Sequence, residues 1–223
     1  MIPKIIHYCW FGRGPKPEQL LRYMKTWQQM LPDYEIREWN ESNFDVSQYV
    51  YSREAYAMGS YAHVSDVCRL HALYHCGGVY LDTDVEVVGS FDPYLKFESF
   101  VGTETWLVGT GVIGSQSGTK WLEEFLGYYS RTHFIDILGH CVRTPNTKIL
   151  TRRILPALPA KYWPAIFPYD YFCGKSWEDG AVAKSENTVS IHNYAASWRR
   201  KDSIPKKLAL RAKGFGVRFL GRK

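Results

Sequence analysis

The chain of 223 residues is 45% apolar and 22% charged, a composition typical of folded globular proteins. No uncharged stretch reaches the roughly 18–20 apolar residues of a membrane span, and the N-terminus lacks the apolar core of a signal peptide, so a spanning or secreted protein is disfavoured. The net charge of +6 is unevenly placed, because residues 199–223 carry ten basic side chains and one acid. Residues 1–198 are therefore mildly acidic, which argues against nucleic acid as the partner.

The first 40 residues predict two parallel strands joined by a helix. Residues 3–10 form a short apolar run behind a proline, as expected for a buried strand. Residues 18–30 place apolar side chains at helical spacing, and residues 34–39 form a second strand after a Pro-Asp turn. Because a helix connects them, the two strands are expected to be parallel.

A long helix and a buried strand come next. Residues 55–76 have helical spacing, interrupted near Gly59 and ended by Gly77-Gly78, and residues 79–88 form the predicted strand. Further elements are expected at residues 100–105 (strand), 111–114 (strand), 120–131 (helix) and 188–192 (strand). This order predicts a single α/β domain over residues 1–198 with a mainly parallel central sheet.

The basic C-terminal tail, residues 199–223, has a pattern of its own. Leu208, Ala212, Phe215 and Phe219 recur at helical spacing beside a stripe of basic side chains, which is typical of a helix lying on an anionic membrane. Glycines in the same stretch weaken the helix, and a solvated tail is the alternative. The pattern predicts a cytoplasmic protein associated peripherally with the inner face of the membrane.

The most informative motif is a pair of aspartates, Asp82 and Asp84, within an otherwise apolar stretch. In a strand, residues two apart point to the same side, so the two carboxylates are expected to lie together. Two like charges at the end of a buried strand repel each other, and a divalent cation such as Mg²⁺ or Mn²⁺ would neutralise them and hold a phosphate-bearing substrate. The alternative is that one aspartate caps a turn and the other is solvated.

A second pair of charged residues precedes this motif. Asp66 and Arg69 lie three residues apart on the predicted long helix and therefore share a face. Alone they would form a helix surface ion pair of little energetic value. Because only the short Gly77-Gly78 link separates this helix from the strand, the pair is expected beside the two aspartates.

Three segments in register resemble the family 32 glycosyltransferases, the group with an Asp-x-Asp sugar-binding region that includes bacterial capsular and O-antigen sugar transferases. The segments are residues 2–12, 65–84 and 191–198, and the sugar-transferring domains of clostridial toxins are similar but more distant. The resemblance implies a GT-A fold, a single Rossmann-like domain. It also implies a hexosyltransferase of cell-surface polysaccharide synthesis that retains the anomeric configuration. The resemblance further implies a nucleotide-sugar donor, with a UDP-sugar favoured over GDP-mannose. The implied acceptor is a saccharide or a lipid-linked saccharide.

The resemblance also implies roles for residues that bind the donor. Trp10 would stack on the donor's base, and Asp66 with Arg69 would hold hydroxyls of the donor sugar. Asp82 would contact the ribose and the sugar. These residues come from two of the three matching segments.

The remaining implied roles concern the metal and the leaving diphosphate. Asp84 and His192 would ligate Mn²⁺ or Mg²⁺, and Ser197 with Trp198 would hold the β-phosphate. Asp82, Asp84 and Trp198 are thus the candidate catalytic residues. The toxin relatives have a carboxylate near this position, where the present chain has His192. The family 32 pattern accepts a histidine there.

Two other classes of protein remain as alternatives. An apolar strand followed by Asp-x-Asp also occurs in haloacid-dehalogenase phosphatases, where the first aspartate is phosphorylated, but those enzymes need later paired acidic ligands. No paired aspartates follow Asp92. A non-catalytic carbohydrate-binding module would explain the 16% of aromatic residues, but not the charged residues beside the aspartate pair.

Overall fold

A strand, a helix and a second strand open the fold, as the sequence predicts. The computed structural model describes residues 1–104, 106–176 and 180–195. The first elements are β1 (Ile5–Cys9), α1 (Glu18–Met30) and β2 (Glu35–Trp39). β1 and β2 pair in parallel, so the predicted crossover is confirmed. Trp27 of α1 is fully buried and donates its indole N–H to the carbonyl of Val85 at 2.8 Å.

The predicted long helix is two helices, α2 (Val50–Ala57) and α3 (Tyr61–Cys76). Gly59 lies between them with a φ of +66°, a conformation that other residues rarely adopt, so the predicted interruption is confirmed. Gly78 follows α3 with a φ of +115°, and a Cβ there would lie 2.7 Å from the carbonyl oxygen of Ile5. Glycine at this position therefore lets the next strand lie directly against β1.

The central sheet has the strand order β2-β1-β3-β6-β5-β7 in the described residues. Its further strands are β3 (Gly78–Leu81), β5 (Ser99–Glu104), β6 (Leu107–Ser115) and β7 (Ala165–Phe167). β1 is parallel to β2 and β3, and β5 is parallel to β7, whereas β6 is antiparallel to both its neighbours. The predicted α/β class with a mainly parallel sheet is confirmed, and β6 is the exception.

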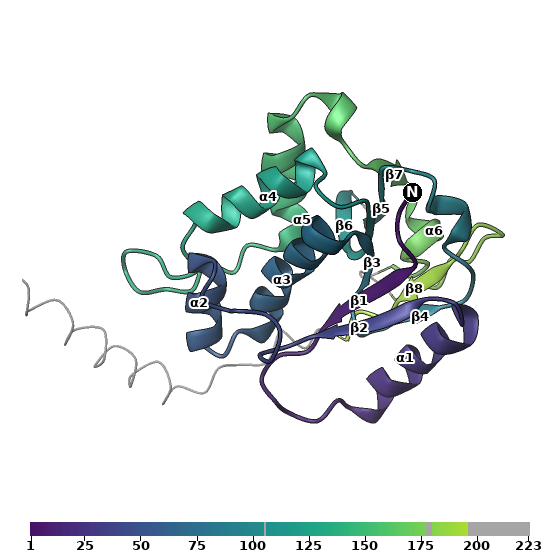
Figure 1. Ribbon diagram of the computed structural model, residues 1–223, viewed down its shortest axis with the longest axis horizontal. Helices are drawn as coiled ribbons and strands as arrows, with labels where there is room; N and C mark the ends of the chain where they lie inside the picture. The colour runs from purple at the N-terminus through teal and green to yellow at the C-terminus, as the bar shows by residue number, and fades with distance from the viewer. Residues whose placement is uncertain (105, 177–179, 196–223) are drawn as a thin grey trace, which may run out of the picture.

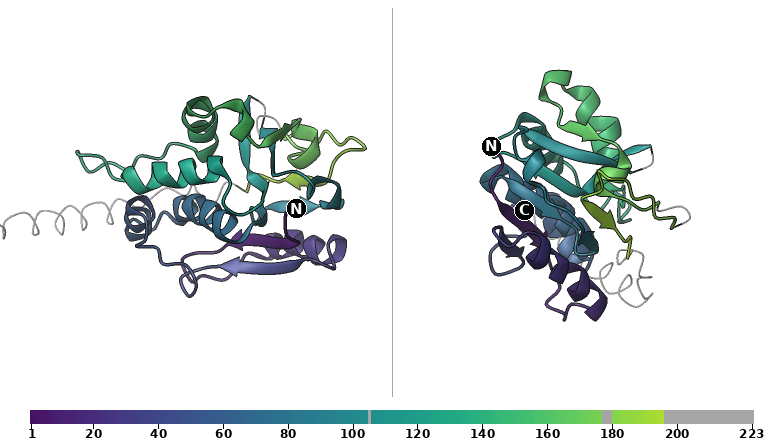
Figure 2. Two further views of the ribbon diagram at one scale, coloured as in Figure 1. Left: turned by 45° about the horizontal axis from the view of Figure 1, so that its top comes forward. Right: turned by 90° about the vertical axis from the view of Figure 1, so that its right-hand side faces the viewer.

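Two hydrophobic clusters cover the two faces of this sheet. Tyr80 and Ile113 point into a cluster with α2, α3 and α4, and their neighbours Val79 and Val112 point into the opposite cluster, which includes Trp27 of α1. This alternation is the period of two expected for strands. Figure 1 shows the helices on either side of the sheet, and Figure 2 shows the same layers from two further directions.

The predicted strand over residues 79–88 is wrong in one respect, because the chain leaves the central sheet after Leu81. Residues 82–84 form a turn in which the backbone N–H of Val85 donates to the carbonyl of Asp82 at 3.0 Å. β4 (Val85–Val87) then pairs antiparallel with β8 (Ser190–His192) in a separate two-stranded sheet. This second sheet brings residue 192 beside the aspartate motif.

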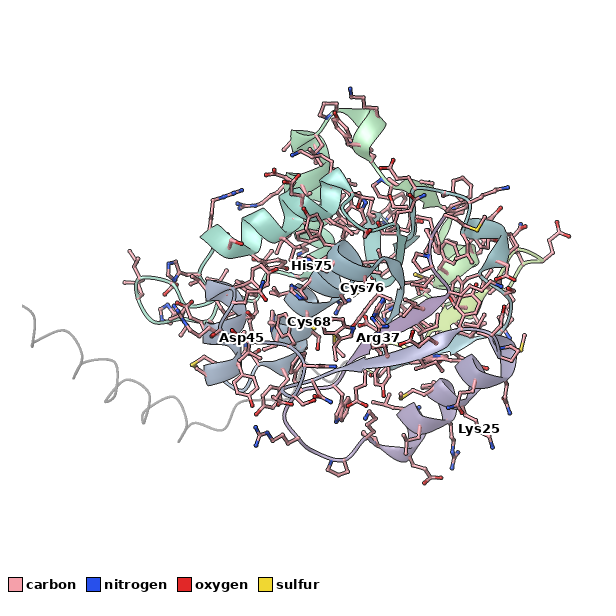
Figure 3. All side chains as sticks on the ribbon, in the orientation of Figure 1. Lys25, Arg37, Asp45, Cys68, His75 and Cys76 are labelled. Carbon is pink, nitrogen blue, oxygen red and sulfur yellow. The ribbon has the colours of Figure 1, made fainter. Side chains whose placement is uncertain are left out.

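The other elements cover the edges of the sheet. α4 (Lys120–Arg131) has the bounds predicted from the sequence, and the shorter helices are α5 (Asn146–Ile149) and α6 (Tyr169–Phe172). Single helical turns lie at Asp92–Tyr94, Leu150–Ile154, Leu155–Ala157 and Ala160–Tyr162. Cys68 lies inside the core, whereas Lys25 and Asp45 point outward (Figure 3). Within the described ranges, the helices are too short or too polar to cross a membrane.

Candidate active site

Asp82 and Asp84 lie where the chain passes from the central sheet to the second sheet. The backbone N–H of Asp82 donates to the carbonyl of Gly111 on β6 at 2.8 Å. The carbonyl of Asp84 accepts from the backbone N–H of Asn193, just after β8, at 2.9 Å. The two aspartates are therefore held by different sheets. They converge through a turn and not, as predicted, through the alternation of a single strand.

His192 brings the two carboxylates together. Its Nε2 atom lies 3.2 Å from Oδ1 of Asp84 and 3.9 Å from Oδ2 of Asp82. The position follows from the register of the second sheet, in which His192 is opposite Val85. The backbone N–H of Ala195 also donates to Oδ2 of Asp84 at 2.7 Å. The predicted grouping of Asp82, Asp84 and His192 is thus present in the structure.

Arg69 binds the other side of Asp82. Its guanidinium lies 3.2 Å from Oδ1 of Asp82 and 2.9 Å from Oδ1 of Asp66, and it donates to the carbonyl of Thr110 at 2.7 Å. The same group lies over the Tyr80 ring, 4.6 Å from its centroid. Because the Arg69 side chain is only 6% exposed, this is a buried ion pair network and not the surface pair that helix spacing alone would give.

The pKa values of these groups reflect both burial and pairing. Burial raises the pKa of the Asp82 carboxyl, against the opposing effect of Arg69. Asp84 is also buried, but the imidazole of His192 lowers the pKa of its carboxyl overall. Burial favours the neutral form of His192, yet the Asp84 carboxylate raises the pKa of this ring well above its ordinary value. Asp84 and His192 therefore form a charged pair.

Gly111 leaves space between these side chains. A Cβ at this position would lie 2.9 Å from Cε1 of His192 and 3.2 Å from Oδ2 of Asp82. Its φ is not in the left-handed region, so the backbone conformation does not require glycine. Glycine at this position therefore leaves space next to His192 and Asp82 that a side chain would fill.

These residues fit a divalent cation. Asp82, Asp84 and His192 each offer a ligand atom, and the three atoms lie within 4.8 Å of one another. Carboxylate oxygens are the preferred ligands of Mg²⁺ and Mn²⁺, and an imidazole ligates transition metals once it is neutral, so a metal bound to His192 would displace one of the protons of this ring. Four carboxylates meet in this region, those of Asp66, Asp82, Asp84 and Glu104. Because only Arg69 and His192 face them as cations in the ion pairs described, a bound cation would reduce the remaining repulsion.

Trp10 lies at the same edge of the sheet as the aspartates. His7 pairs with Tyr80 in the parallel β1–β3 register, so Trp10 and Asp82 both follow the carboxyl ends of adjacent strands. Ligands of open α/β sheets bind outside these strand ends. The Trp10 indole donates to the carbonyl of Gly14 at 2.7 Å, and the ammonium of Lys16 lies 5.7 Å from its ring centroid.

Two predicted site residues, Ser197 and Trp198, lie outside the described residues, as does the basic tail. The structure adds others that the sequence did not single out. Glu104 ends β5 and Cys173 follows α6, and both lie beside His192. An acid at the end of a buried strand was the available signal for Glu104. Cys173 had none, because its place depends on the path of the chain after β7.

Comparisons with known proteins match the part of the chain that carries the Asp-x-Asp motif. Residues 17–101 match the family model described as the glycosyltransferase sugar-binding region containing the DXD motif. This segment includes Asp66, Arg69, Asp82 and Asp84. The resemblance predicted from the sequence is therefore confirmed for this part of the chain.

Two proteins are similar in sequence to parts of this chain. Inositol phosphoceramide mannosyltransferase 3 of Schizosaccharomyces pombe is 32% identical over 126 residues, which is 54% of this chain and 35% of that protein. An uncharacterized protein of Arabidopsis thaliana is 32% identical over 90 residues, 40% of this chain and 14% of that protein. The chain thus spans about a third of the length of the yeast relative and less of the plant one.

Two solved structures show the fold. The PaToxG glycosyltransferase superposes with a TM-score of 0.53 at 18% identity, over 71% of this chain and 70% of that one. A glycosyltransferase involved in the glycosylation of the major capsid of PBCV-1 has a TM-score of 0.50 at 9% identity, over 94% of this chain and all of that one. The predicted GT-A type of α/β fold is confirmed.

Proposed function

We propose that this chain is a metal-dependent glycosyltransferase that moves a hexose from a nucleotide sugar to a saccharide acceptor. The observation that carries the proposal is the convergence of Asp82, Asp84 and His192 beside the buried pair of Asp66 and Arg69. The match of residues 17–101 to a sugar-binding region supports the substrate class. The fold shared with two glycosyltransferases supports the reaction class.

The charged network suits the recognition of a sugar. Arg69 fixes the orientation of the two carboxylates by contacting one oxygen of Asp66 and both oxygens of Asp82. These side chains stay 15% and 25% exposed, and each carboxylate oxygen can accept more than one hydrogen bond, so both groups can still accept from hydroxyls of the donor sugar and ribose. Because the carboxylates are held in place before binding, little reorganisation is required when the donor arrives.

The other half of the site suits the leaving group. Departure of a nucleoside diphosphate concentrates negative charge at the phosphates, and a divalent cation supplies the stabilisation of that charge when bound. Asp82, Asp84 and His192 would hold the cation, with Mn²⁺ or Mg²⁺ as the ion. Ser197 and Trp198 would donate hydrogen bonds to the β-phosphate. These roles derive from the residue types and the predicted resemblance.

We also propose that transfer retains the anomeric configuration. The acceptor hydroxyl would attack from the face that the diphosphate leaves, and a diphosphate oxygen would take its proton. The linkage of the product, determined by NMR after reaction with an α-linked donor, tests this step. An α-linked product is expected, and a β-linked product would rule the proposal out.

The donor base is proposed to be uracil, bound on the Trp10 side of the sheet edge. Trp10 follows β1 next to the strand that leads to Asp82, so a base near Trp10 and a diphosphate near Asp84 are compatible with one extended donor. Comparing UDP and GDP as inhibitors of nucleotide-sugar turnover tests the choice. Stronger inhibition by GDP, together with use of GDP-mannose, would replace uracil with guanine.

Turnover of nucleotide sugars is the direct test. The full chain is incubated with a panel of UDP- and GDP-sugars, with and without a saccharide acceptor, and free nucleotide is measured with Mn²⁺ and with EDTA. Release that needs the cation is expected, and Asp84→Asn should lower it by at least about 100-fold, as expected when transition-state charge stabilisation is lost. Asp33→Asn, an exposed carboxylate paired with Lys4, is the matched control and should leave it unchanged.

The two alternative classes give different results in the same preparation. Hydrolysis of p-nitrophenyl phosphate without nucleotide release would indicate a phosphatase. Saccharide binding that is unaffected by Asp84→Asn, with no turnover of any donor, would indicate a binding module.

The cellular place of the reaction is proposed from the charge pattern alone. The basic tail would bring the chain to the anionic inner face of the membrane, where lipid-linked saccharide acceptors of cell-surface polysaccharide synthesis lie. Full-length protein with Lys206, Lys207, Arg211 and Lys213 replaced by Gln should sediment less with anionic vesicles than the original protein. Equal sedimentation would contradict the membrane role.

A further inference from the structure

The second ring nitrogen of His192 lacks a hydrogen bond. Its side chain is 10% exposed, and its Nδ1 atom is buried without a hydrogen-bond partner among the described residues. The nearest charged group is the carboxylate of Glu104, whose Oε1 atom lies 3.7 Å away. This separation is too long for a hydrogen bond. A buried polar atom without a partner destabilises the folded protein, so the groups around Nδ1 decide which ligand would satisfy it.

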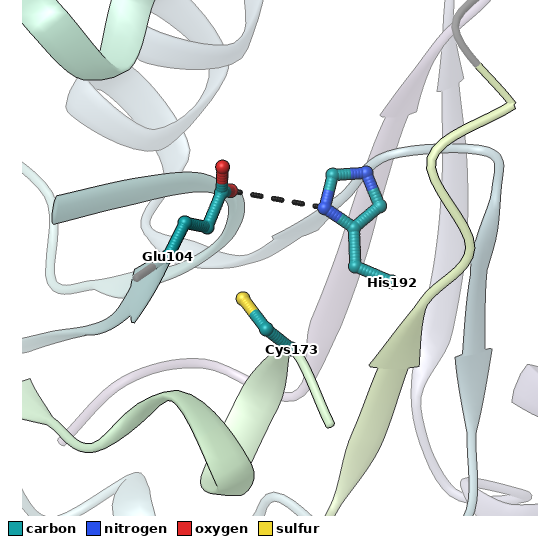
Figure 4. Close-up of side chains that lie close together, drawn as sticks. All are labelled: Glu104, Cys173 and His192. Carbon is teal, nitrogen blue, oxygen red and sulfur yellow. Dashed lines mark ion pairs between the residues drawn. The ribbon is translucent and has the colours of Figure 1, made fainter. Parts of the chain in front are cut away.

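The thiol of Cys173 lies in the same place. The backbone of His192 donates to the carbonyl of Cys173 at 2.8 Å, which fixes the two residues side by side. The ligand atoms of Glu104, Cys173 and His192 all lie within 4.8 Å of one another. In Figure 4 the Glu104 carboxylate and the His192 ring point toward each other, and the Cys173 sulfur lies next to both. The three side chains come from β5, the segment after α6, and β8.

The composition of this cluster is that of a zinc site. Thiolate, imidazole and carboxylate are the usual zinc ligands, with bond lengths of about 2.0–2.3 Å. Tetrahedral coordination at those lengths places a carboxylate oxygen and an imidazole nitrogen about 3.3–3.5 Å apart. The 3.7 Å between Oε1 of Glu104 and Nδ1 of His192 is longer than a hydrogen bond and a few tenths of an ångström above this range, so a small shift of the Glu104 side chain would complete the geometry. We propose that Glu104, Cys173 and Nδ1 of His192 bind Zn²⁺, with a fourth position open to water.

This site and the aspartate site share one imidazole. A neutral imidazole has a single acceptor nitrogen, so the ring can bind a metal through Nδ1 or through Nε2 but not through both. When Zn²⁺ binds Nδ1, Nε2 keeps its proton and donates to Asp84, which already lies 3.2 Å away. The Cys173 thiol and Nδ1 of the protonated His192 ring each lose a proton to solvent as the Zn–S and Zn–N bonds form. Zinc therefore removes His192 from the Asp82 and Asp84 site.

The consequence is an inhibitory switch that rests on the proposed function. The thiolate selects Zn²⁺, whereas the two carboxylates of the other site suit Mg²⁺ or Mn²⁺, so the two ions would seldom exchange places. Zinc at low concentration should then suppress donor turnover in the presence of excess Mn²⁺, and a chelator should restore it.

Cobalt reports the thiolate ligand without any enzymatic reaction. Co²⁺ replaces Zn²⁺ at such sites, and a sulfur ligand gives an intense charge-transfer band in the near ultraviolet. The full chain, kept reduced with a phosphine, is titrated with Co²⁺ and then with Zn²⁺. We expect one equivalent of the band, lost on addition of Zn²⁺, and no band in Cys173→Ser. Cys76→Ser is the matched control, because Cys76 is also a free cysteine and lies outside the cluster.

Two further variants separate the sites. Glu104→Gln keeps the thiol and should weaken Co²⁺ binding by at least about tenfold. Asp84→Asn removes a ligand of the other site only, and the band should remain. If the original protein shows no thiolate band, or if Cys173→Ser keeps it, the zinc site is overturned, and Glu104 then only orients His192. Because the spectrum needs no turnover, this failure is distinct from a failure to use nucleotide sugars.

Discussion

The two sides of Asp82 differ in how completely their charges are satisfied. On one side Arg69 binds Asp66, Asp82 and the carbonyl of Thr110, and Tyr80 donates to Oδ1 of Asp82 at 2.8 Å. On the other side His192 lies 3.9 Å from Asp82, and one of its nitrogens has no hydrogen bond within the described part of the chain. The charges of the first side are paired within the protein, whereas those of the second side leave room for a cation.

This difference separates what holds the site from what the site can bind. A buried ion pair network contributes little net stability, but loss of one partner leaves the others buried and unpaired. A polar atom that lacks a hydrogen bond, next to carboxylates whose charge is not fully neutralised, is instead suited to bind a cation. We therefore expect substitutions on the Arg69 side to act mainly on folding stability, and those on the His192 side to act mainly on metal binding.

The largest effect on stability is expected for Arg69→Met. Removal of the guanidinium leaves the Asp66 and Asp82 carboxylates without their partner, which should lower the free energy of unfolding by about 3–5 kcal/mol. Urea denaturation followed by circular dichroism measures this loss. Arg22→Met, which removes an exposed pair with Glu18, is the matched control and should cost far less. An equal loss in the free energy of unfolding for the two variants would contradict the role of Arg69 as the partner of two buried carboxylates.

His7 provides a contrast to His192, because both nitrogens of its ring have hydrogen-bond partners. His7 is fully buried, pairs through Nε2 with the carbonyl of Gly77 at 2.7 Å, and accepts from the Trp39 indole at 2.9 Å. Burial lowers the pKa of His7 from 6.5 to about 4, the opposite direction to His192. The unfolded chain therefore binds more protons between these values, and stability is lost as pH falls from 6.5 to 4.

This shift predicts a loss of about 3 kcal/mol from His7 between pH 7 and pH 4. Because carboxylates also titrate there, the comparison is made with His7→Gln, whose amide keeps a donor and an acceptor but does not titrate in this range. Urea denaturation at several pH values should show a shallower decline for the variant. Parallel declines would show that His7 does not carry the predicted pH dependence.

A smaller effect is expected for Tyr80→Phe on the Arg69 side. The variant loses one buried hydrogen bond to a charged group and keeps the ring beneath the guanidinium, so about 1.5 kcal/mol of stability should be lost. Thermal and urea denaturation measure the change. A loss as large as that of Arg69→Met would indicate that the tyrosine hydroxyl, and not the guanidinium, holds the network.

The fold was predictable where a local pattern decides the structure. The spacing of apolar residues placed α1 and α4 at their observed bounds, and Gly59 marked the break between α2 and α3. The turn at residues 82–84 was not predictable, because its apolar flanks read as one strand. Only the pairing of β4 with β8, more than 100 residues later in the chain, shows that two sheets meet there.

The candidate site divides in the same way. Asp66 with Arg69, and Asp82 with Asp84, could be predicted because each pair is close in sequence. Glu104 and Cys173 could not, since their proximity to His192 depends on three segments that meet only in the folded chain. Hydrophobic patterning places elements but carries little information on which polar side chains lie together across them.

Binding of Mn²⁺ to the full chain is the measurement that tests the central claim most directly. Free Mn²⁺ is followed by electron paramagnetic resonance during a titration at neutral pH, in the presence of UDP. One saturable ion is predicted for the original protein and for Asp33→Asn, and at least about tenfold weaker binding for Asp84→Asn. Equal Mn²⁺ affinity in all three proteins would contradict the assignment of Asp82, Asp84 and His192 as the cation site.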